Sequence, residues 1–172
     1  MGIEPFLIAS TVRAVVGQRL VRRLCQHCKV AYKPDDATVK TIAQSFGIKN
    51  TDVMQYISKL EERAIAGGIG VTESAASKKM SSSPKGISSL YKPNPEGCDE
   101  CNHSGFKGRM GIYEVLDNSP EVQKLIISNA TSTVISDQAI KEGMVPMLID
   151  GFVKALRGET TAEEILRVTA EA

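Results

Sequence analysis

Two matched Cys-x-x-Cys motifs constrain this chain more than any other feature of its sequence. They hold all four cysteines: Cys25 and Cys28 in RRLCQHCKVAY, and Cys98 and Cys101 in GCDECNHSGFKGR. A Cys-x-x-Cys turn places two sulfurs on one side of the backbone, and two such turns supply four thiolates for a tetrahedral Zn²⁺ site. Because all four ligands would be protein side chains, the motifs predict one structural zinc ion with no open position for catalysis.

Other uses of the cysteines fit the sequence less well. The first residues lack a basic stretch followed by an apolar core, so we expect a cytoplasmic chain whose thiols stay reduced rather than forming disulfides. A thioredoxin-like redox pair needs a Cys-x-x-Cys at a helix start after a strand, and neither pair is followed by a clear helix. A site with three cysteines and His27 remains an alternative, although His27 and His103 are more typical of exposed turn residues.

The composition gives little support to nucleic-acid binding. The formal net charge of the 172 residues is +1, and aromatic residues make up 5%, with no tryptophan. Nucleic-acid-binding proteins typically carry a basic surface and, for single strands, aromatic stacking platforms. We therefore expect no nucleic-acid partner and keep an independent zinc-dependent nucleic-acid or protein-binding module as the alternative function. Arg22, Arg23 and Lys29 lie close enough in sequence to offset the negative charge of four thiolates.

The two motifs lie unusually far apart. Residues 29–97 separate them, whereas simple zinc fingers and ribbons leave roughly 12–20 residues. The gap holds two predicted helices, at 35–46 and 51–63, and a Gly-, Ser- and Lys-rich stretch at 66–89 that is typical of a flexible linker. Zinc would then hold two predicted strands, 15–20 and 108–116, side by side. The other predicted elements are a largely buried helix at 5–14 and helices at 119–128, 131–142, 146–157 and from a capping box at Thr161 onward.

Several stretches together resemble a known family. MGIEPFLIAS, GQRLVRRLCQHC, GCDECNHSGFKGRMGIYEVL and DGFVKALRGETTAEEILRV are similar to the C-terminal part of the secretion ATPases, the motors of type II secretion and type IV pilus assembly. The four cysteines followed by the pattern KGR-x-GI-x-E are its most specific part. The resemblance covers residues 1–33 and about 90–169, and we expect 34–89 to lie outside it because typical relatives carry a shorter segment there.

The resemblance implies a hexameric, cytoplasmic, bacterial ATPase of the RecA-like class, held at the inner membrane through a platform protein. In that family the phosphate-binding P-loop, the Walker B acid and the histidine box precede the region seen here. The sequence contains no GxxxxGK[ST]. We therefore expect a fragment in which Met1 is an internal position of the parent, with no catalytic residues of its own. ATP and Mg²⁺ would bind only in the full-length parent.

The expected fold is an α+β fragment of such a motor, with a zinc subdomain inserted between two strands and a small bundle of short helices after them. For Arg19 a contact to a neighbouring subunit's nucleotide and a solvated position are equally consistent with the sequence. Arg22 and Arg23 are expected to balance the thiolates or to face solvent. The expected divisions are residues 1–24, the end of the RecA-like domain; 25–104, the zinc subdomain; 105–116, the returning strand; and 117–172, the helical subdomain.

Overall fold

The structure, a computed structural model, describes residues 4–46, 82–83, 86–87 and 89–170. The predicted helix at 51–63 and most of the predicted linker at 66–89 lie outside the described residues. Within the described part, no helix is both long enough and apolar enough to cross a bilayer. The strands are β1 (Ala14–Leu24), β2 (Val30–Tyr32), β3 (Ser82–Ser83), β4 (Gly86–Ile87), β5 (Leu90–Lys92) and β6 (Phe106–Asp117). The helices are α1 (Pro5–Thr11), α2 (Asp36–Ser45), α5 (Pro120–Ile127), α6 (Ser132–Lys141), α7 (Met147–Leu156) and α8 (Ala162–Ala170), with a 3-10 turn at Asp99–Cys101.

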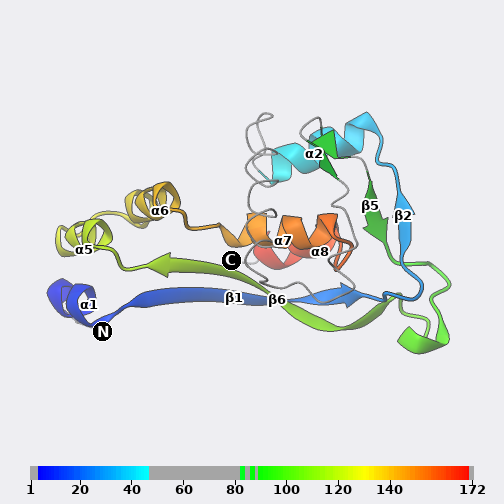
Figure 1. Cartoon of the computed structure of the whole chain (residues 1–172), viewed down its shortest axis with the longest axis horizontal. Coiled ribbons are helices and arrows are strands. Elements are labelled where there is room, and N and C mark those ends of the chain that lie inside the picture. Colours follow the sequence, from blue (N-terminus) through cyan, green and yellow to red (C-terminus); the bar gives the residue numbers. More distant parts are fainter. Residues whose placement is uncertain (1–3, 47–81, 84–85, 88, 171–172) are drawn as a thin grey trace.

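A long antiparallel ribbon of β1 and β6 runs along the molecule (Figure 1). Its register runs from Ala14 opposite Asp117 to Arg22 opposite Arg109, and shifts by a bulge before Leu24 pairs with Phe106. The strands predicted at 15–20 and 108–116 are therefore confirmed and extend further at both ends. β2 and β5 form a second short antiparallel pair, and β3 pairs with β4.

Helices α7 and α8 pack on one face of the ribbon and enclose the main core. Val21 of β1 and Ile112 of β6 are fully buried there, because alternate strand residues point to the same face. Phe152 of α7 meets Phe46, the residue that ends α2, with ring centroids 4.6 Å apart. The predicted helix at 35–46 is thus confirmed, and Asp35 caps it by accepting a hydrogen bond from Thr38 N.

The motif KGR-x-GI-x-E has a packing explanation. Ile112 is buried, and Glu114 accepts a hydrogen bond from Met147 N at the start of α7, with a donor–acceptor distance of 3.3 Å. The side chain of Glu114 needs the space above Gly17, where a Cβ would lie 2.9 Å from Glu114 Cγ. Gly111 is covered in the same way by the ring of Tyr113. The motif therefore fixes α7 on the ribbon.

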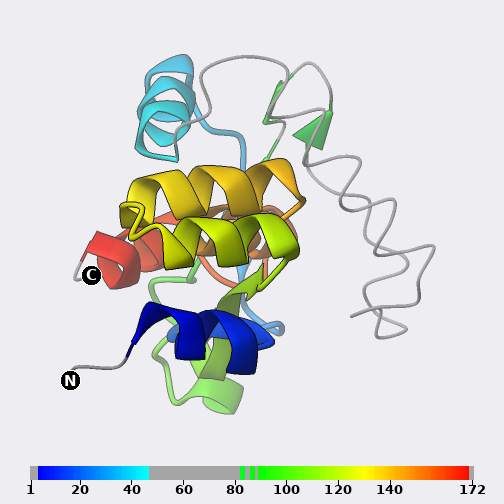
Figure 2. The same ribbon diagram turned by 90° about the vertical axis from the view of Figure 1, so that its left-hand side faces the viewer.

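At the far end of the ribbon, α1 packs against α5 and α5 against α6 (Figure 2). Asn118 joins the two strand ends there, since its Nδ2 donates to Ala9 O and Val12 O. The prediction of a helix at 5–14 buried on most sides is wrong. The helix ends at Thr11, and Phe6, Leu7 and Ile8 are exposed, because the only helix that packs closely on α1 in the described structure is α5.

The four predicted C-terminal helices all form, but they do not make the single small bundle that we expected. α5 and α6 lie at the α1 end of the ribbon, whereas α7 and α8 lie over its middle (Figure 1). Ser119 caps α5 by accepting from Val122 N, as the Ser-Pro sequence predicts. The capping box at Thr161 is only half formed. Thr161 Oγ1 accepts from Glu164 N, but the Glu164 carboxylate contacts Arg22 and Arg167 instead.

Candidate metal centre

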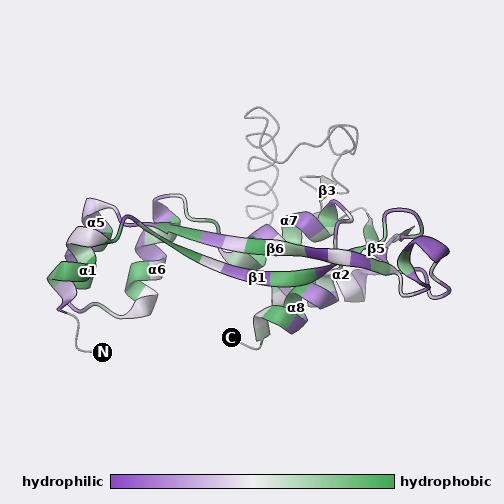
Figure 3. Cartoon of the chain, turned by 90° about the horizontal axis from the view of Figure 1, so that it is seen from below, coloured by the Kyte–Doolittle hydropathy of each residue, from purple (hydrophilic) through white to green (hydrophobic). Residues whose placement is uncertain are grey.

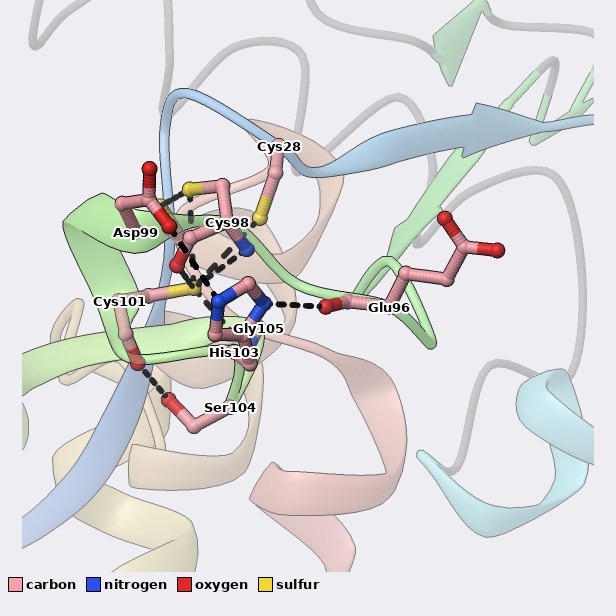
Figure 4. A network of polar contacts seen from close by, with 9 residues as sticks. Cys28, Glu96, Cys98, Asp99, Cys101, His103, Ser104 and Gly105 are labelled. Carbon is pink, nitrogen blue, oxygen red and sulfur yellow. Dashed lines mark hydrogen bonds and ion pairs between the residues drawn. The ribbon is translucent and has the colours of Figure 1, made fainter.

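The four cysteine sulfurs meet where the ribbon ends. Cys25 directly follows β1, and Cys98 and Cys101 enclose the 3-10 turn that precedes β6 (Figure 4). The Sγ atoms of Cys25 and Cys98 lie 3.7 Å apart, those of Cys28 and Cys101 3.8 Å, and those of Cys98 and Cys101 3.7 Å. All four lie within 4.8 Å of one another. A tetrahedron with Zn–S bonds of roughly 2.3 Å has sulfurs about 3.8 Å apart, so the spacing fits four-thiolate coordination of zinc.

Backbone groups hold the second pair in place. Cys98 N and Gly105 N donate to Cys101 Sγ over 3.4 and 3.3 Å. Cys25 N donates to Gly105 O, which joins the first pair to the second. Gly97 has a φ of +63°, and a Cβ there would lie 2.3 Å from His103 Cα, so only glycine fits this turn.

Neither histidine joins the cysteines. His103 uses both ring nitrogens elsewhere, with Nδ1 2.9 Å from Glu96 O and Nε2 3.3 Å from Asp99 Oδ1 (Figure 4). His27 is exposed, and its ring nitrogens are not among the ligand atoms that converge. The sulfurs are also too far apart for disulfides, whose S–S bond is about 2.05 Å. The geometry thus favours four cysteines over the three-cysteine, one-histidine alternative.

The thiols of Cys28 and Cys101 differ in acidity. Burial, reinforced by hydrogen bonds from the other cysteines, raises the pKa of Cys28 to about 12. Burial alone would also raise the pKa of Cys101, but the amides of Cys98 and Gly105 stabilise its thiolate and lower the pKa to about 6. A metal ion that binds Cys28 as a thiolate must therefore displace its proton.

The basic residues near the site follow the prediction only in part. Arg22 does not balance the thiolates, because it forms an ion pair with Glu164 and lies 4.3 Å over the ring of Phe106. Arg23 is exposed to solvent, which is one of the two positions that we expected for it. The cation that the thiols affect is Lys107, which sequence reasoning missed. Its pKa is raised by Glu100 first and, more weakly, by Cys25 and Cys98.

Arg19 lies apart from the cysteines, on β1 opposite Ile112. It lines a cavity of about 790 Å³ together with Glu114, Met147 and Leu166. The cavity lies between the ribbon and the helices α7 and α8. A contact between Arg19 and nucleotide stays a prediction.

A second contact that the sequence did not predict is made by the turn between α7 and α8. We call residues 158–161 the docking turn. It forms hydrogen bonds to Arg22 and Leu24 at the end of β1, including one of 2.8 Å from Leu24 N to Glu159 O, and to the side chains of Gln26 and Lys29, which lie beside the first two cysteines. The only signal in the sequence is Gly158, which ends α7 and has a φ of +67°.

Comparison with known proteins identifies a family and several relatives that this chain resembles. The family described as "Type II/IV secretion system protein" matches residues 1–167. The type IV pilus assembly ATPase PilB of Thermus thermophilus is 34% identical over 171 residues, which cover 99% of this chain and 15% of the relative. PilB of Pseudomonas aeruginosa is 33% identical, with 99% and 23% covered. The type II secretion system ATPase E of Vibrio cholerae is 33% identical, with 99% and 26% covered.

Two points follow from these matches. The chain spans about a quarter or less of the length of these curated relatives. The matched region also includes residues 34–89, so the expectation that this segment lies outside the resemblance is wrong.

Proposed function

Since the chain belongs to the Type II/IV secretion system protein family, we propose that it is the zinc-binding C-terminal part of a hexameric cytoplasmic ATPase that powers type IV pilus assembly or type II secretion. The observation that supports this role best is the meeting of four sulfurs at tetrahedral spacing in a chain that matches such ATPases over 99% of its length. ATP and Mg²⁺ would bind in the rest of the parent.

The role proposed for the metal is structural. Cys25, Cys28, Cys98 and Cys101 would hold Zn²⁺, which leaves no position for a water or substrate molecule. The site lies where β1 ends and shortly before β6 begins, so a bound ion would fix the two ribbon strands and the insertion between them. In this proposal the metal site stabilises the subunit, and the same region contacts an inner-membrane platform protein.

The exposed apolar side chains support a position within a larger protein. Val16, Leu20 and Val115 are 60, 52 and 50% exposed, and the register places them on the ribbon face that does not carry Val21 and Ile112. Figure 3 shows hydrophobic segments along both strands of the ribbon. Phe6 of α1 is 56% exposed. Large exposed apolar patches usually mark contacts with other protein. We propose that the rest of the RecA-like domain, of which residues 1–24 would be the end, covers this surface in the parent.

Two measurements test the proposed function. The 172-residue chain, purified without chelator, is expected to carry about one zinc per molecule and to hydrolyse no ATP. A graft of this chain in place of the matching region of Pseudomonas aeruginosa PilB is expected to form a hexamer with ATP turnover, and the same graft with Cys98→Ser is not. A graft that binds zinc but stays monomeric and inactive would contradict the motor role while leaving the metal site standing.

A further inference from the structure

The docking turn contacts the chain on both sides of Cys25. On the strand side, Thr160 Oγ1 donates to Arg22 O over 2.8 Å, and Leu24 N donates to Glu159 O over 2.8 Å. On the side of the cysteine pair, two side chains donate to one carbonyl of the turn. Gln26 Nε2 and Lys29 Nζ lie 3.2 and 2.7 Å from Gly158 O.

The contacts on the strand side lie among buried residues. Thr160 and Cys25 are fully buried, Leu24 is 1% exposed and Thr161 is 5% exposed. Hydrogen bonds in such surroundings are costly to leave unmade, because a freed donor or acceptor cannot turn to solvent. The end of β1 up to Cys25 and the docking turn are therefore expected to be ordered together.

We propose that the docking turn couples the four-cysteine site to helices α7 and α8, so that metal occupancy and the docking of these helices stabilise each other. Coordination by Cys25 and Cys28 fixes the peptide whose neighbouring atoms hold Gly158, Glu159 and Thr160. Coupling of this kind is reciprocal, so loosening the turn weakens metal binding by the same factor. The inference rests on the proposed metal site, but not on the assignment to pilus assembly or secretion.

The coupling is local. The ion pair between Arg22 and Glu164 adds a contact from the same strand end to α8. Helices α5 and α6 lie at the other end of the ribbon (Figure 1). Removing the metal is therefore expected to loosen α7 and α8 and to leave α5 and α6 protected.

Amide hydrogen exchange of the 172-residue chain, with zinc bound and after removal by a chelator, tests the locality. We expect at least tenfold faster exchange in the docking turn and α8, and less than a twofold change in α5 and α6. Equal protection of α8 with and without zinc, in a chain shown to bind one zinc, would overturn the coupling alone. A chain that binds no zinc would overturn both the site and the coupling.

The reverse effect, that of the docking turn on zinc affinity, is tested with variants that keep all four cysteines. Thr160→Val removes a buried hydroxyl donor at nearly constant volume, and Lys29→Met removes a partly exposed one. Each is expected to weaken zinc binding about fivefold in competition with a chromophoric chelator, the effect of one lost hydrogen bond. Thr133→Val and Lys124→Met, at the remote end, are the matched controls and should bind zinc like the unaltered chain.

Two further outcomes complete this test. Thr160→Ser keeps the hydroxyl and is expected to restore zinc affinity, which a change of packing alone would not explain. If Thr160→Val fails to fold, Lys29→Met decides. Unaltered zinc affinity in a folded Lys29→Met chain would then refute the coupling.

Discussion

Arg22 on β1 and Glu164 on α8 form a two-point ion pair across 142 positions of sequence. Arg22 Nε lies 2.8 Å and Nη2 2.6 Å from Glu164 Oε2. The Glu164 side chain is only 2% exposed, whereas that of Arg22 is 53% exposed. Arg167 contacts the other carboxylate oxygen. A buried carboxylate with two arginines on it ties the last helix to the end of the ribbon strand that leads into Cys25.

Glu164→Gln should destabilise the chain and make its free energy of unfolding less dependent on pH. Burial favours the neutral acid, but hydrogen bonds from Arg22 and Arg167 outweigh it and place the pKa of Glu164 below its ordinary value. A lowered pKa in the folded chain means that this stabilisation is full above the unfolded-state value of about 4.5 and is lost as the pH falls through the folded value. We expect a loss of about 2 kcal/mol at pH 7 and a difference that shrinks toward pH 3. Urea unfolding of both chains from pH 3 to 7 measures this, and a difference that grows on acidification would contradict it.

Loss of a cysteine ligand should have a much larger effect than loss of a nearby polar group. Cys98→Ser is expected to abolish stoichiometric zinc binding and to destabilise the chain by about 3 kcal/mol or more, because binding energy at a structural site is folding energy. His27→Ala, an exposed change within the first motif, should retain one zinc. Elemental analysis together with thermal unfolding separates the two variants. Zinc retained by Cys98→Ser but lost by His27→Ala would indicate a different ligand set.

The sequence predicts the parts of this structure that depend on local pattern. Paired Cys-x-x-Cys turns predict the four sulfurs that converge, β-branched runs predict the ribbon strands, and Ser119 before Pro120 predicts the start of α5. The arrangement of the C-terminal helices was missed, because α5 and α7 both have amphipathic sequences and no local pattern indicates which surface each one covers. The partner of Arg22 was missed for the same reason, since a contact over 142 positions leaves no spacing to recognise.

Substitutions on the two faces of the ribbon should change the free energy of unfolding by very different amounts. Leu20 is 52% exposed, whereas Ile112 is fully buried against the helices. Leu20→Glu should change the free energy of unfolding by less than about 0.5 kcal/mol, and Ile112→Ala should cost about 2–5 kcal/mol. Leu20→Glu should also reduce self-association of the 172-residue chain, because it places a charge in the exposed apolar surface. Sedimentation at increasing concentration checks this, and unfolding of Leu20→Glu would show that the face is not free.

Gly158→Ala should destabilise the chain more than Gly108→Ala, although both glycines have a left-handed backbone. Their φ values are +67° and +78°, so each alanine carries a similar conformational cost of about 1 kcal/mol. The surroundings differ. A Cβ at Gly158 would lie 2.7 Å from the ring of Tyr91 and 2.9 Å from Lys29 Nζ, whereas no atom lies within 4 Å of one at Gly108.

The flexible Lys29 side chain can move away from such a Cβ, but the backbone that carries the Tyr91 ring is fixed by the pairing of β5 with β2. The clash is therefore expected to add about 1–3 kcal/mol for Gly158→Ala, the usual cost of overpacking. Urea unfolding of both zinc-loaded variants gives the difference directly. Equal destabilisation would mean that Tyr91 yields readily and that the docking turn is less tightly packed than its contacts indicate.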